Sequence, residues 1–262
     1  MISRRVGAEP TALESHWKTT SMTAPPDDPH PPLRSPRATK PILVGSSADR
    51  FEGLVEPRTR LDNLRMLHLD VGRKVVEVAD GHVFMPDLIV MAMLQRSYGV
   101  VDALIDAVDS YNMHAAAPLL RLQLDTLFRA SYLAACPDAD DLARRLLAGE
   151  EFQGMTDSAG KKLTDARLQR LARANHEWAI AVYRQTSGWV HFSVSHMRAT
   201  TQVGAENDFF MGIPLRPTVL PESLWLEVYG AASQATEEIV DYALEWASRK
   251  GLPPGETREI NW

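Results

Sequence analysis

The segment YRQTSGWVHFSVSH, residues 183–196, contains the side chains most suited to cleaving a phosphodiester. An imidazole that titrates near neutral pH can take up and return a proton. A guanidinium can stabilise the charge that a phosphorane gains when the 2'-hydroxyl of RNA attacks phosphorus. We therefore take His191 and Arg184 as candidate catalytic residues, with Ser187 able to orient either one. The same pattern also fits a histidine that satisfies a break in a helix bundle, which we expect at Gly188.

A second set of charges lies in the segment LLRLQLDTLFRASYL. Arg121, Asp125 and Arg129 follow one another at intervals of four residues, which places them along one stripe of a helix. On a solvent-facing stripe they form an ion-pair ladder without functional meaning. On an inward-facing stripe, two arginines around one acid leave donors free for a phosphate or a carboxylate. Both interpretations stay open, and the three residues are candidate binding or supporting residues.

Other site chemistries are weakly supported by the sequence. His191 and His196 are five residues apart and do not share a face of an ideal helix, so we expect no metal site. Cys136 is the only cysteine, which excludes an intramolecular disulfide and favours a reducing compartment. The chain has no GxSxG, Walker A or GxGxxG motif, and we expect neither a serine hydrolase site nor a cofactor.

The elements that position these residues are predicted to be helices. Apolar residues recur every three to four positions over most of the chain after residue 57, which predicts an all-α bundle of five to seven helices. The runs MRATTQV and FFMGIPL, separated by GAEND, could form a short β-hairpin before the last helix. The expected helices cover about 57–81, 86–111 and 114–136, a short acidic segment after Pro137, a segment that Thr164 caps, and 222–250.

The N-terminal region has a different composition. Eight of the 17 prolines fall within the first 45 residues, where the missing N–H donors disfavour helices and sheets. We expect residues 1–48 to be a disordered arm and residues 49–262 to be one domain. The arm could also dock on a protein partner as a polyproline II segment, although a plain linker is the simpler interpretation.

Composition restricts where the protein acts and what it binds. The first twenty residues lack the apolar run of a secretory signal, and charges interrupt the apolar stretches at 88–108 and 115–136. We expect no membrane span and a cytoplasmic location. The net charge of -6 disfavours general polyanion binding, so contact with RNA requires a local basic patch.

The combination of RLQLDTLFRASYL in a central helix with a later YRQTSGWVHFS resembles uncharacterised bacterial helical proteins of the HEPN-like type. The resemblance covers roughly residues 85–250. It implies that Arg184 and His191 cleave RNA without a metal ion, in a cleft between two protomers. The spacer departs from the family pattern, since Gly188 and Trp189 replace a plain helical turn with a polar residue after the arginine.

Two hypotheses about function follow. The first is a metal-independent RNA endonuclease, serving as a toxin or defence element, that acts as a homodimer through His191 and Arg184. The second is a non-catalytic helical interaction or scaffold module, which the acidic balance and the proline-rich arm favour.

Overall fold

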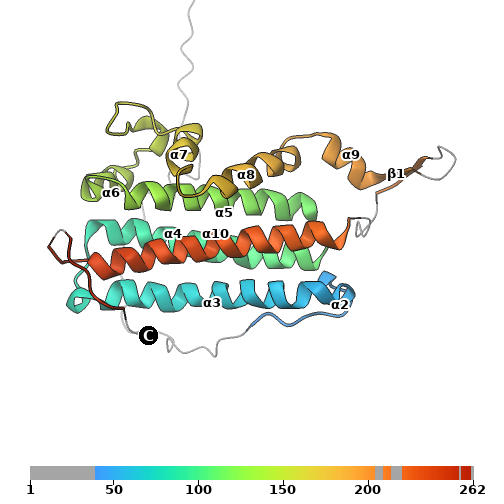
Figure 1. Ribbon diagram of the computed structural model, residues 1–262, viewed down its shortest axis with the longest axis horizontal. Coiled ribbons are helices and arrows are strands. Elements are labelled where there is room, and N and C mark those ends of the chain that lie inside the picture. The colour runs from blue at the N-terminus through green and yellow to red at the C-terminus, as the bar shows by residue number, and fades with distance from the viewer. Residues whose placement is uncertain (1–38, 204–208, 214–219, 254, 261–262) are drawn as a thin grey trace, which may run out of the picture. The chain divides into compact units, whose positions relative to one another are not determined.

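The computed structural model describes residues 39–203, 209–213, 220–253 and 255–260. Four long helices dominate this part of the chain, and Figure 1 shows them side by side. α3 packs against α4 and α10, and α5 packs against the same two helices from the other side. α3, α5 and α10 run in one direction and α4 runs in the opposite direction. Their bounds are Val55–Glu77 for α3, Met85–Asp109 for α4, Met113–Ala134 for α5 and Glu222–Arg249 for α10.

The shorter elements lie on the outside of this bundle or extend from it. α7 and α8 lie along α5, α6 packs against α4, and α9 leads away from the end of α8 toward β1 (Figure 1). β1 and β2 pair antiparallel, with Thr201 opposite Met211; the residues 204–208 that join them are outside the described part. The bounds are α2 Ser47–Arg50, α6 Ala139–Leu147, α7 Asp165–Ala172, α8 Glu177–Val190, α9 Val194–Thr200, β1 Thr201–Val203 and β2 Phe209–Met211, with 3-10 turns at Glu52–Leu54, Ala79–Gly81 and Phe152–Gly154.

Local sequence explains where the principal helices begin. Asn112 and Thr164 cap α5 and α7, because each side chain accepts a hydrogen bond from the backbone N–H three residues later. At α4 the capping side chain lies inside the helix: the Asp87 carboxylate accepts a hydrogen bond from the backbone N–H of Phe84, three residues earlier, at 2.8 Å. Pro86 stands in the first turn of α4, where a proline costs no hydrogen bond. The predicted helical bundle is therefore confirmed.

The number and division of the helices differ from the prediction. The described residues form nine α-helices rather than five to seven. The helix that Thr164 caps ends at Ala172, and α8 begins only at Glu177, so one predicted helix is two. Gly188, which we expected to break a helix, lies within α8. A single glycine costs a helix about 1 kcal/mol, which tertiary packing readily offsets.

Residues 39–48, which the sequence analysis assigned to the arm, pack on the bundle. The backbone N–H of Lys40 donates to Asp62 at 2.7 Å, and Lys40 Nζ pairs with Asp102 and Asp106. Arg58 donates to the carbonyl oxygen of Lys40 at 2.9 Å. The compact unit accordingly starts at Ala38 rather than at residue 49. The remainder of the predicted arm, residues 1–38, lies outside the described residues.

α4 is long and apolar enough to cross a membrane, by length and composition alone, and it is the one such helix among the described residues. In the structure it packs against α3, α5 and α10. Val101, Leu104 and Ile105 of α4 are fully buried there. The core helix of a bundle meets the same criterion of length and hydropathy.

Candidate functional site

α8 positions the two candidate catalytic residues. Arg184 lies in its middle, and His191 is the residue that ends it, with an extended backbone and an N–H that donates to the carbonyl oxygen of Ser187 at 3.1 Å. Seven positions along a helix correspond to about 10 Å of axis and to nearly two full turns, which returns to almost the same face. Arg184 and His191 therefore leave α8 on neighbouring sides.

Both side chains are exposed to solvent. Within the part of the chain that the structure describes, neither one has a side-chain hydrogen bond or ion pair, and no such bond joins them to each other. Ser187 is half-buried between them, and it is the backbone of Ser187, rather than its hydroxyl, that contacts His191. The guanidinium and the imidazole are thus both available to a ligand.

Gly188 allows the start of α9 to approach α8 closely. A Cβ atom at this position would lie 3.1 Å from the hydroxyl oxygen of Ser195 and 3.3 Å from that of Ser193. The Ser193 hydroxyl donates a hydrogen bond to the Gly188 carbonyl oxygen. The glycine interpreted as a helix breaker is better explained by this close contact.

Aromatic and imidazole rings cluster beside His191. His196 is stacked between His114 and Phe192, with ring centroids at 5.1 Å and 5.5 Å. Trp189 contacts both histidines, at 5.4 Å from His114 and 5.7 Å from His196. Burial, and then the neighbouring His196, lower the pKa of His114. That His114 joins this cluster could not be predicted from the sequence, because His114 lies at the start of α5, far from His196 along the chain.

The charged stripe of α5 divides into two parts. Asp125 pairs with Arg129 and accepts from Arg96 of α4 at 3.1 Å, and Arg129 reaches Asp165 of α7 at 2.9 Å. These pairs hold α4, α5 and α7 together.

Arg121, the first residue of the α5 stripe, stands apart from this network. Its guanidinium carbon lies 4.0 Å from the centroid of the Tyr183 ring of α8. Its Nη1 is buried and has no hydrogen-bond partner within the described residues. Arg121 therefore lies in the interface between α5 and α8.

A further polar group went unnoticed in the sequence. The buried His176 connects α8 to α10: its Nε2 lies 2.7 Å from the Tyr242 hydroxyl and its Nδ1 lies 2.7 Å from a carboxylate oxygen of Glu238. Glu238 also accepts from Trp178 at 3.0 Å. Burial works against ionisation of Glu238, yet the contacts with His176, Gln234 and Trp178 leave its pKa lowered. The sequence around His176 does not indicate its partners, because Glu238 and Tyr242 lie more than sixty residues away along the chain.

Among the described residues, no three His, Cys, Asp or Glu side chains gather in a way that could hold a metal ion. Comparison of the chain with models of protein families, with curated proteins and with solved structures finds no match. The protein is therefore defined by its fold, a helical bundle, and by the geometry of its own side chains.

Proposed function

We propose that this protein is a metal-independent RNA endonuclease in which His191 and Arg184 act on one phosphodiester. The observation that carries the proposal is that both side chains are exposed on nearly the same face of α8 and lack partners among the described residues. A catalytic base needs an accessible imidazole, and a phosphate needs a guanidinium whose donors are not already engaged. The resemblance to HEPN-like proteins supports the same assignment.

In the proposed reaction, His191 accepts the proton of the RNA 2'-hydroxyl while the 2'-oxygen attacks the adjacent phosphorus. The 5'-oxygen leaves with its electron pair and takes up a proton from water, which yields a 2',3'-cyclic phosphate and a 5'-hydroxyl, and His191 then returns its proton to the solvent. Arg184 stabilises the charge on the non-bridging oxygens as the phosphorane forms.

The proposal includes a homodimer and a cytoplasmic location, where RNA is available. Within one chain the two catalytic residues are separated by about 10 Å of helix axis. A second copy docked on this end of α8 would bring its own Arg184 and His191 close to the first pair. The distance between an arginine and a histidine would then be shorter than within one chain. Apolar side chains that a partner could cover are exposed here, namely Phe192 at 88%, Met197 at 59% and Val194 at 56%.

The test is cleavage of a structured RNA by the purified full chain in EDTA. We expect the wild type to cut and His191→Ala or Arg184→Ala to lose at least about 100-fold in rate, which is the usual contribution of a general base or a charge-stabilising group. Mass spectrometry of the fragments should find cyclic phosphate ends.

Matched controls are His82→Ala and Arg173→Ala, because both residues are exposed and lie outside α8 and α9. Equal cutting by the wild type and the His191 and Arg184 variants would identify a contaminating nuclease and refute the assignment.

The alternative is a non-catalytic interaction module, which the exposed apolar side chains around α9 favour in their own right. A partner that binds through the proline-rich arm belongs to this alternative, and the arm lies outside the described residues apart from its last ten. A purified wild type that leaves RNA intact in EDTA, yet sediments as a dimer that Phe192→Ser dissociates, would favour the module over the nuclease.

A further inference from the structure

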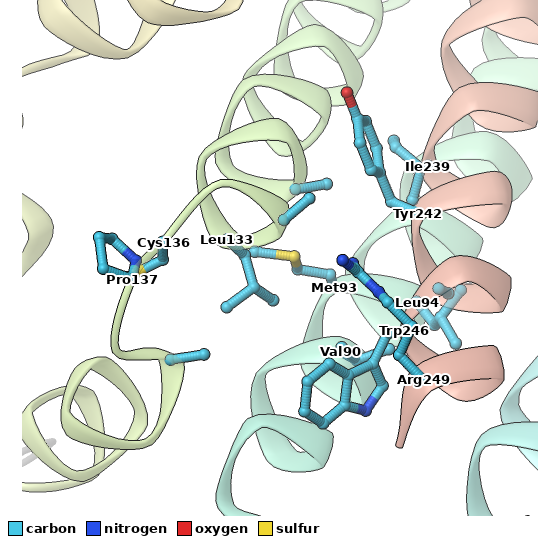
Figure 2. A pocket seen from close by; sticks show the side chains of 14 residues that line it. Val90, Met93, Leu94, Leu133, Cys136, Pro137, Ile239, Tyr242, Trp246 and Arg249 are labelled. Carbon is cyan, nitrogen blue, oxygen red and sulfur yellow. The ribbon is translucent and has the colours of Figure 1, made fainter. Parts of the chain in front are cut away.

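The bundle contains a pocket of about 410 Å³ on the side of the molecule where α4, α5 and α10 meet. This volume falls in the range of small-molecule sites, which are usually concave and apolar with a few well-placed polar groups. Figure 2 shows the pocket between the three helices, with Met93 of α4, Leu133 of α5 and Ile239 of α10 among the side chains that line it. It is separate from Arg184 and His191, neither of which lines it.

Two side chains of α10 give this apolar pocket its principal free polar groups. Tyr242 and Arg249 both line it, seven positions apart on the same helix. They therefore lie on nearly the same face, about 10 Å apart along the axis. Trp246 lies between them, but its indole N–H is already donated to Asp87 at 2.7 Å. Figure 2 shows the Tyr242 hydroxyl at the upper edge of the lining side chains and the Arg249 guanidinium in their middle.

Arg249 provides a positive charge that an anion could use. Its side chain is 40% exposed, and its described ion partner is Glu245, at 3.2 Å, which is 52% exposed. Such an exposed pair contributes little to stability, and a guanidinium has five N–H donors, of which this contact occupies few. A carboxylate of a bound molecule can therefore displace or join Glu245 at small cost.

Tyr242 is held in place by the buried His176, whose Nε2 lies 2.7 Å from the phenol oxygen. Nδ1 of the same ring lies 2.7 Å from a carboxylate oxygen of Glu238. A phenol can donate one hydrogen bond and accept two, so the bond to His176 leaves the Tyr242 hydroxyl with capacity for a further hydrogen bond to a ligand.

We infer that the pocket binds an elongated, mainly apolar small molecule with a carboxylate at one end, which contacts Arg249, and a hydroxyl at the other, which forms a hydrogen bond with Tyr242. The apolar lining buries the chain of the ligand, and the separation of the two polar groups selects its length. This site is independent of the proposed RNA cleavage, since it uses none of the same residues.

Isothermal titration calorimetry of the full chain tests this with ω-hydroxydecanoate and decanoate, below their micelle-forming concentrations. We expect both to bind the wild type, and ω-hydroxydecanoate to bind about fivefold more tightly because of one additional hydrogen bond. Decan-1-ol should bind at least about tenfold more weakly than decanoate, because it lacks the charge that Arg249 recognises.

Variants assign each end of the pocket. Arg249→Gln should weaken both acids about tenfold, and Tyr242→Phe should abolish the preference for the hydroxyl acid while decanoate still binds. Arg73→Gln is the matched control, because Arg73 is an exposed arginine paired with an acid three residues away on α3. Ala134→Leu, which fills the pocket from α5, should abolish binding of both acids.

Thermal unfolding followed by circular dichroism establishes that each variant is folded. If Tyr242→Phe is not folded, Ala134→Leu still tests whether the acids bind in the pocket. Absence of heat with the wild type would overturn the inference. So would equal affinity for the two acids, a hydroxyl preference that survives in Tyr242→Phe, or equal weakening by Arg249→Gln and Arg73→Gln.

Discussion

At the scale of single residues, His68 shows how burial links protonation to folding. Its ring lies inside the bundle, where Nδ1 lies 2.9 Å from the carbonyl oxygen of Leu64 and Nε2 lies 2.8 Å from the hydroxyl of Ser97. A carbonyl can only accept, so Nδ1 carries the proton and Nε2 accepts from Ser97. Burial lowers the pKa of His68, although the hydrogen bonds with the backbone carbonyls of Leu64 and Arg65 oppose the shift.

This lowered pKa predicts acid destabilisation. Below about pH 6.5, the ordinary pKa of histidine, the unfolded chain binds a proton at His68 that the folded chain does not. The contribution of His68 to the free energy of unfolding is fully present above that pH and is lost as the pH falls toward the pKa of His68 in the folded protein. We expect the free energy of unfolding in urea to decrease between pH 6.5 and 5, and His68→Gln to reduce this slope while lowering stability at pH 7.

The control is His82→Gln, because His82 is exposed on a turn. His114, whose pKa is also lowered, contributes to the slope in the same direction, so His68→Gln should reduce it without abolishing it. An unchanged slope in His68→Gln would show that His68 is protonated in the folded protein, which contradicts the arrangement described above.

At the scale of elements, the long helices were predictable and their cross-connections were not. α4 and α5 agree with the sequence to within a few residues, because more than twenty residues of regular apolar spacing outweigh any local ambiguity. The division between α7 and α8 was missed since the apolar stripe continues across it, from Leu171 to Trp178. Local spacing contains no information about which helix a side chain will meet.

The candidate sites follow the same rule. Arg184 and His191 could be proposed together because one helix carries both. His114 beside His196, and His176 between Glu238 and Tyr242, each depend on packing between helices that are distant in the chain. The proline-rich composition similarly suggested that the arm extends to residue 48, whereas buried Arg58 and Asp62 recruit the residues around Lys40 into the fold.

The buried ion pair at the end of α10 yields a prediction at this scale. Lys250 is fully buried, and its Nζ lies 2.9 Å from Asp87 of α4 and 2.7 Å from the carbonyl oxygen of Val75 in α3. Lys250→Met leaves the Asp87 carboxylate buried without its cation, which should cost about 3 kcal/mol of unfolding free energy in urea.

Lys74→Met is the comparison for this ion pair, since Lys74 is partly exposed and lies 3.9 Å from Glu77. It should cost less than about 1 kcal/mol. The double variant Asp87→Ala with Lys250→Met should recover part of the loss, because it leaves no unpaired charge. A single variant as stable as the wild type would mean that solvent reaches Asp87.

At the scale of the whole molecule, the bundle ends are closed by segments that lie outside the four long helices. Residues 39–48 form one such closure. Arg58, which is 2% exposed, ion-pairs with Asp109 and also donates to the carbonyl oxygens of Lys40 and Pro41. The pair with Asp109 keeps the pKa of Arg58 raised, although burial acts in the opposite direction. The N-terminal boundary of the domain is therefore set by the need to satisfy this buried guanidinium.

Two truncated chains test that boundary. A chain that begins at Ala38 keeps every contact of this closure, whereas one that begins at Asp49 leaves Arg58 with two donors lacking acceptors and removes the Lys40 N–H from buried Asp62. The Tyr111 hydroxyl also loses its acceptor, the Ser46 carbonyl oxygen. At about 1 to 2 kcal/mol for each unsatisfied group, the shorter chain should be less stable by about 4 kcal/mol.

Calorimetry of the two chains side by side should record a melting temperature about 10 °C lower for the one that begins at Asp49. Arg58→Met, introduced into both chains, separates the effect of the unsatisfied guanidinium from a general loss of packing. Without the guanidinium, part of the difference in melting temperature between the two chains should disappear. Equal melting temperatures for the two unsubstituted chains would place the boundary at residue 49, as composition alone suggested. In that case the contacts of Lys40 and Pro41 would contribute nothing to the stability of the bundle, and solvent would have to satisfy Arg58 in their place.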